Sequence, residues 1–193
     1  MAYICNSSNL GFVDLYLNDT LGPGALLMTG TSRGRFEYPG VVVTGVDPVL
    51  GGAEFMFVQF GGTVAAGGVV ELSITSVNSG ARMDVSAIAW AGAANTGKPL
   101  GVALAAATSG TWGWVQVSGI AVTNTSGTVA AGDKQFWQAS GVISSTVVAS
   151  KQVLNAEAVS ANNATYGSGT GAVTLSGQSL ILINRPCAQG AIT

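Results

Sequence analysis

Apolar and polar residues alternate along most of this chain, and that two-residue period is the feature that most constrains its fold. In residues 70–75, Val70, Leu72 and Ile74 fall on one face, and Glu, Ser and Thr fall on the other. A period of two is typical of a β-strand with one buried face, whereas a helix needs a period near 3.6. Because helical periodicity is almost absent, the sequence predicts an all-β protein.

Further segments carry the same signature, and residues that favour turns separate most of them. Gly contributes 28 of the 193 residues and is spread along the chain without a collagen-like period. Many short strands joined by such turns are typical of β-sandwiches and barrels. We therefore predict an antiparallel sandwich or barrel with Gly-rich turns. Besides the segment above, the expected strands are Phe12–Leu17, Val41–Val46, Glu54–Phe60, Arg82–Trp90, Leu100–Ala106, Trp112–Ser118, Gln135–Ala139, Val142–Val147, Val153–Val159 and Leu180–Asn184.

One segment has the composition of a helix instead. Val102–Ala107 is rich in alanine, which has the highest helix propensity. Gly101 and Gly110 flank it, and for this reason we expect a strand there.

A six-residue sequence, Gly-Thr-Val-Ala-Ala-Gly, occurs at Gly62–Gly67 and again at Gly127–Gly132. It marks either a duplicated β unit or chance similarity in a chain rich in Gly, Ala and Val. A soft boundary near Gly92–Pro99 suggests two β regions, residues 1–92 and residues 93–193.

The chain lacks the residues that most enzymes and metal sites use. It has no His, which removes the commonest general base and metal ligand. The nine Asp and Glu residues follow no metal-ligand spacing. We therefore expect no catalytic residues, no cofactor and no metal, and we predict that the protein is not an enzyme.

Charged residues make up only 8% of the chain, against about 25% in an average soluble domain. The seven Lys and Arg residues are scattered, which disfavours nucleic-acid binding. No apolar stretch reaches the length of a spanning helix, and residues 1–10 do not have the pattern of a secretion signal, so we expect no membrane segment and a cytosolic origin. A surface with little charge favours association, so we also expect an oligomer or assembly on a larger body.

Two residue pairs leave alternatives open. Cys5 and Cys187 either form a bridge between the ends of the chain or stay reduced, as thiols of a cytosolic protein usually do. Trp112 and Trp114 share one face of a strand, where they form either a sugar-stacking platform or anchors of the core or of a subunit interface. Gln116 is the only polar group that follows them on that face, which favours anchors.

Three stretches within residues 97–161 stand out: Gly101–Ala107, Thr111–Gly119 and Val129–Asp133. Together they resemble a module of tailed-bacteriophage structural proteins, above all of capsid decoration (cement) proteins. The resemblance covers about a third of the chain, and residues 1–92 show no likeness to the module.

The resemblance implies a β-rich virion protein, often a homotrimer, that binds the major capsid protein on the outer capsid surface and stabilises the shell. It implies assembly in the host bacterial cytoplasm. The competing predictions are a phage tail-fibre or receptor-binding module and a carbohydrate-binding β domain.

The residues before the first clear strand are uncharged yet contain apolar side chains. Tyr3 and Ile4, followed by Leu10 and Phe12, could anchor an extended arm to a sheet edge of another subunit or of a capsid protein. The alternative is that these residues begin the first strand of the protein's own sheet. We name these four residues as the candidate capsid or subunit contact.

Overall fold

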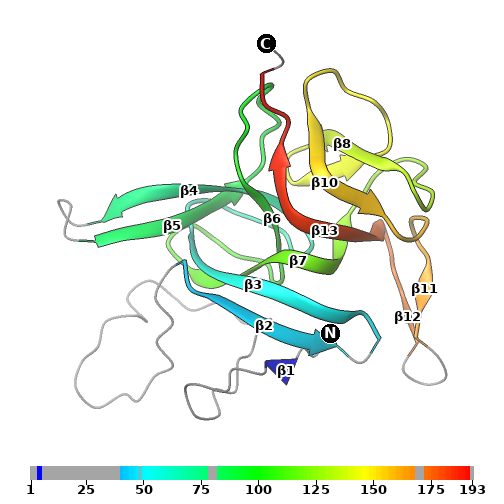
Figure 1. Cartoon of the computed structure of the whole chain (residues 1–193), viewed down its shortest axis with the longest axis horizontal. Coiled ribbons are helices and arrows are strands. Elements are labelled where there is room, and N and C mark those ends of the chain that lie inside the picture. The colour runs from blue at the N-terminus through cyan, green and yellow to red at the C-terminus, as the bar shows by residue number, and fades with distance from the viewer. Residues whose placement is uncertain (1–3, 6–39, 48, 78–81, 168–171, 192–193) are drawn as a thin grey trace.

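A computed structural model describes residues 4–5, 40–47, 49–77, 82–167 and 172–191, and this part of the chain is all β (Figure 1). The predicted fold class is therefore confirmed. Within these ranges there is no helix that could cross a membrane. The expected strand Phe12–Leu17 lies outside the described residues.

The strands are β1 (Ile4–Cys5), β2 (Val42–Asp47), β3 (Gly51–Phe60), β4 (Val69–Val77), β5 (Arg82–Ala89), β6 (Leu100–Ala103), β7 (Trp112–Asn124), β8 (Lys134–Ala139), β9 (Val142–Ser144), β10 (Gln152–Ala158), β11 (Thr165–Tyr166), β12 (Val173–Thr174) and β13 (Gln178–Ala188).

Five strands close into a first small barrel. β3 pairs with β5, β5 with β4, β4 with β6, β6 with β7, and β7 pairs again with β3. The pair β3–β5 is parallel, at Phe60 and Ala87, which departs from the wholly antiparallel arrangement that we expected. The ring closes because alternate apolar side chains of all five strands meet inside it. This interior contains Val58, Phe60, Val64, Val70, Leu72, Ala87, Ala103, Ala107, Val115 and Val117.

A second barrel is built on the first and shares a strand with it. β7 pairs with β13, β13 with β10, β10 with β8, and β8 with β9. A parallel bridge between Thr125 and Ile143 returns the ring to the end of β7. Residues 112–118 of β7 pair with β3, and residues 118–124 pair with β13. The 13-residue strand therefore belongs to both barrels and joins them without a linker.

The two copies of the repeated hexapeptide adopt the same turn at the same place in each barrel. Each copy has a buried Val, a turn that ends in a Gly with positive φ, and a strand that starts two residues later (β4 or β8). A Gly at this position suits a turn that needs φ > 0. The bonds that close the turns are Gly68 N to Ala65 O (3.0 Å) and Asp133 N to Ala130 O (3.2 Å).

The equivalence extends around both rings. Gly67 N donates to Ala103 O at 2.8 Å, and Gly132 N donates to Ala158 O at the same distance. Three strand pairs of the first unit also have counterparts in the second. Phe60–Ala87 corresponds to Thr125–Ile143, Val102–Gln116 to Glu157–Leu182, and Phe57–Trp114 to Val122–Leu180. The hexapeptide thus marks a duplicated β unit. The segment Gly92–Pro99 connects β5 to β6 inside the first unit.

Gly119 lies where β7 passes from one barrel to the other. Its φ is +94°, and a Cβ built on it would lie 2.5 Å from Gly52 O and 2.9 Å from Cα and Cβ of Ala53. Only a residue without a side chain fits this close approach of β3. The junction of the two units therefore depends on this glycine.

The hairpins of the two units differ in length and position. In the first unit β4 and β5 run on beyond the barrel, whereas the equivalent β8 and β9 are short. In the second unit the β11–β12 hairpin is inserted between β10 and β13, where Tyr166 and Leu175 pack on a cluster with Leu50. The alanine-rich segment contains the end of strand β6 at Ala103 and then irregular chain, so the expected strand to Ala106 is too long.

Candidate interaction surfaces

The four residues predicted to make capsid or subunit contacts fall mainly outside the described part of the chain. Tyr3, Leu10 and Phe12 are among the residues that the structure does not describe. The backbone of Ile4 lies in β1 and pairs with Val46 of β2, within the same chain. The structure does not bring these four residues together, and the arm remains a prediction.

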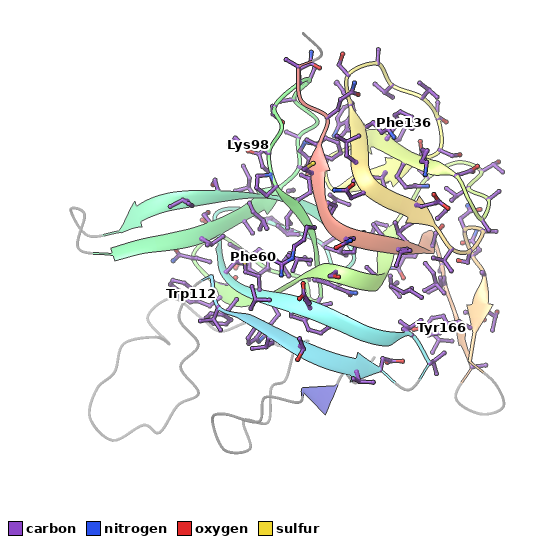
Figure 2. The ribbon with its side chains drawn as sticks, viewed as in Figure 1. Phe60, Lys98, Trp112, Phe136 and Tyr166 are labelled. Carbon is purple, nitrogen blue, oxygen red and sulfur yellow. The ribbon has the colours of Figure 1, made fainter. Side chains whose placement is uncertain are left out.

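Trp112 and Trp114 belong to the core. Both indoles are more than nine-tenths buried, on the outer side of the first barrel, against Phe55 and Phe57. The Trp112 ring, labelled in Figure 2, stacks on the Phe57 ring with centroids 6.0 Å apart. The Trp114 ring lies 5.1 Å from the Phe57 ring at a tilt of 57°. The prediction of core anchors is confirmed, and these two rings do not form a sugar-stacking platform.

Gln116, on the same face of β7, is also engaged inside the protein. Its side chain is buried, and its Nε2 donates to the carbonyl oxygens of Ser118 (3.1 Å) and Ile120 (3.0 Å). These bonds satisfy carbonyl groups around the bend at Gly119. The amide therefore stabilises the junction and does not face a ligand.

Trp137 is a half-buried aromatic residue whose ring also makes contacts within the protein. Lys151 Nζ lies 4.1 Å from the ring centroid, and the indole N–H donates to Trp90 O at 3.3 Å. The backbone of Gly92 lies so close to the ring that an added Cβ would come within 2.2 Å of it. These contacts stabilise the second barrel and leave little of the ring for a sugar.

Lys98, Lys134, Lys151 and Arg185, whose side chains the structure describes, all have partners. Lys98 pairs with Glu71 at 3.0 Å and Arg185 with Glu54 at 2.7 Å, while Lys134 pairs with Glu157 and Lys151 contacts Trp137. The pairs lie apart on different strands and do not form a basic stripe that could follow a phosphate backbone.

The described residues contain no group of three or more Cys, Asp and Glu side chains that could hold a metal ion. Asp47 is buried, but its Oδ1 accepts from Val49 N (2.7 Å) and Leu50 N (2.9 Å) and so orders the β2–β3 turn. Cys187 carries a free thiol, in agreement with the reduced-thiol alternative, and its backbone bridges to Pro99.

The described surface also carries large apolar side chains, which are scattered over strands and turns. The exposed large apolar residues are Val42, Val46, Val49, Ile74, Ile88, Val147, Val159, Val173 and Leu182. A groove of about 270 Å³ adds apolar surface between the two barrels, where Met56, Leu72, Pro99 and Pro186 line it together with Arg185. The arrangement suits contact with another protein surface better than binding of a charged small molecule.

Comparisons with known proteins give little beyond this. No family profile matches the chain, and no curated protein matches its sequence. A crystal structure of the N base of head fiber gp8.5 from bacteriophage phi29 is similar at a TM-score of 0.42 and 15% identity, over 69% of this chain and 95% of that one. A TM-score this low carries no inference about function.

Proposed function

We propose that this chain is a non-enzymatic structural protein of a tailed-phage virion, which binds the outer capsid surface through the major capsid protein and stabilises the shell. One observation carries the proposal. The stretches that resemble the decoration-protein module contain most of β6, the first part of β7 and the second hexapeptide turn, and β7 is the strand that the two barrels share. The likeness therefore falls on the framework of the fold and not on a peripheral loop.

The chemistry of the described surface supports the same class of function. Its charged groups are few, six of them form three ion pairs, and most of its other exposed side chains are apolar or uncharged. Such a surface suits a protein that is covered on assembly. We propose that the protein is a homo-oligomer, for which the resemblance favours a trimer.

Co-sedimentation with capsids tests the proposal. Purified protein is mixed with heads that lack their decoration protein, and the bound fraction is measured after pelleting. We expect saturable binding at a fixed ratio to the capsid subunit and a higher melting temperature of the heads. Heads that already carry decoration protein serve as the control and should bind little.

Two outcomes would contradict the proposal. If the protein fails to bind undecorated heads but binds host cells or glycans, it is a receptor-binding module, which is the competing prediction. If light scattering shows a monomer at micromolar concentration, the proposal of a trimer is wrong, because this method measures molar mass and distinguishes one copy of the chain from three.

A further inference from the structure

β4 continues beyond the first barrel as one arm of a projecting ribbon, which Figure 1 shows at the left. The β4–β5 ladder runs on to the pair Val77–Arg82. The last bond on the other edge of β4 runs from Leu72 N to Pro99 O, at 2.9 Å. Among the described residues, β4 past Leu72 therefore pairs only with β5.

The direction of the backbone groups on this edge follows from the strand period. Leu72 directs its N–H toward Pro99, whereas Val69 directs its carbonyl oxygen toward Trp90, at the end of β5. Alternate residues of a strand direct their N–H and C=O to opposite sides. Ile74 and Ser76 thus present their backbone donors and acceptors on the open edge.

Comparison with the second unit shows that the barrel does not need this extension. β8 and β9 close the equivalent ring with 6 and 3 residues, whereas β4 and β5 have 9 and 8. The other added hairpin, β11–β12, has an internal role because Tyr166 packs on the cluster around Leu50. Ile74, by contrast, is 70% exposed and belongs to none of the core clusters. Val85, opposite Ile74 on β5, still packs on the interior of the first barrel, whereas Ile74 adds exposed apolar surface on β4.

The sequence of the extension lacks the devices that keep strand edges from pairing. Natural edges are protected by charges, by proline or by bulges. Residues 72–77 read Leu-Ser-Ile-Thr-Ser-Val, with no charge and no proline, and their ladder with β5 is regular. The apolar groove begins next to this edge, at Leu72 and Pro99, and its one charged side chain, Arg185, is paired with Glu54. The occupant that fits is an extended, uncharged strand with alternating apolar side chains.

We propose that this edge is a self-association site, occupied by β4 of a second copy of the chain in antiparallel orientation. Residues 72–77 of β4 are themselves the strand that the edge requires, and two copies of this uncharged segment do not repel each other. With Ile74 opposite the partner's Ser76, the two strands exchange four backbone hydrogen bonds, and position 75 lies on the two-fold axis. Both Ile74 side chains then lie on the same face of the joined sheets, where diagonal neighbours are in reach.

The contact is small, so it is expected to be weak between free molecules and stronger where copies are held side by side. It concerns two copies of this chain and is measured without capsids. Its failure would leave the proposed capsid binding untouched, and failure of capsid binding would leave this contact untouched.

Disulfide trapping tests the contact even if it is weak. In the proposed register the two copies of position 75 face each other at a pair without hydrogen bonds, where Cβ atoms lie about 4.5–5.5 Å apart, a spacing from which a disulfide forms with little movement. Thr75→Cys is oxidised with diamide, and the covalent dimer is quantified on a non-reducing gel. Val147→Cys is the matched control because Val147 is 74% exposed but lies on a loop. Wild-type protein gives the background from Cys5 and Cys187.

We expect Thr75→Cys to form several times more dimer than Val147→Cys. Adding Ile74→Lys, or in a separate variant Ser76→Lys, to Thr75→Cys should return the yield to the control level, because like charges then meet across the axis. Circular dichroism verifies that each variant is folded. Equal dimer yields from Thr75→Cys and Val147→Cys would overturn the proposal, and so would a Thr75→Cys dimer that neither Lys substitution reduces.

Discussion

Gly119→Ala should destabilise the protein far more than the same substitution at a glycine that only needs a positive φ. At φ = +94° the left-handed backbone of an alanine lowers the free energy of unfolding by roughly 1–2 kcal/mol. Its Cβ would also lie 2.5 Å from Gly52 O, which is backbone and cannot rotate away. Moving β3 away from β7 is comparable to overpacking a core, which costs about 1–3 kcal/mol. The expected loss is about 2–5 kcal/mol, a large part of a typical stability of about 5–15 kcal/mol.

Gly127→Ala is the matched control. Its φ is +70°, and nothing lies within 4 Å of the added Cβ, so only the backbone cost of about 1–2 kcal/mol applies. The gain of about 0.4–1 kcal/mol from a stiffer unfolded chain is common to both variants and cancels in their difference. Urea unfolding followed by tryptophan fluorescence gives the two free energies. Equal losses in the two variants would refute the close approach of β3 to Gly119.

Three further predictions concern the core, an alkaline transition and an ion pair. Trp114→Ala should cost about 3–5 kcal/mol of unfolding free energy in urea, because a buried ring is lost; a loss below 1 kcal/mol would mean that the indole is exposed. Burial, and secondarily the Asp47 carboxylate, raises the pKa of Tyr166 above its usual 10.0. The neutral phenol therefore stabilises the fold below pH 10, and this contribution disappears as the pH rises through the higher pKa of the folded state. Between pH 9 and pH 11 the melting temperature should fall more in wild type than in Tyr166→Phe, and parallel curves would contradict this. Lys134→Ala should change stability by under about 1 kcal/mol in urea, because Lys134 and Glu157 are largely exposed.

The all-β class and most strand positions could be predicted because they depend on local pattern. Alternation in residues 70–75 requires that Val70 and Leu72 share a face, and both are buried in the first barrel. Ile74 has the same alternation but lies beyond the barrel, so the pattern that predicted burial gave the wrong environment for this residue. Periodicity identifies a face of a strand, but not what covers it.

The candidate sites were less predictable, because burial of a ring depends on strands far away in the sequence. Trp112 and Trp114 are buried because β3 places Phe57 against them, more than 50 residues earlier in the chain. Among the described residues, the edge of β4 past Leu72 is likewise unpaired because β6 begins only at Leu100, opposite Glu71. No local signal in residues 72–77 distinguishes an edge strand from a paired one except the missing charges and proline.

By itself, the sequence determined the strand period, the glycine turns, the shortage of charge and the repeat of six residues, since each of these is a property of neighbouring residues. Only the tertiary structure decided that the repeat is a duplicated barrel, because the evidence is hydrogen-bond register between strands such as β6 and β7 or β10 and β13. It also decided that the two barrels share β7. A shared strand requires β3 and β13 to pair with successive halves of one segment, and such long-range pairing leaves no trace in local composition.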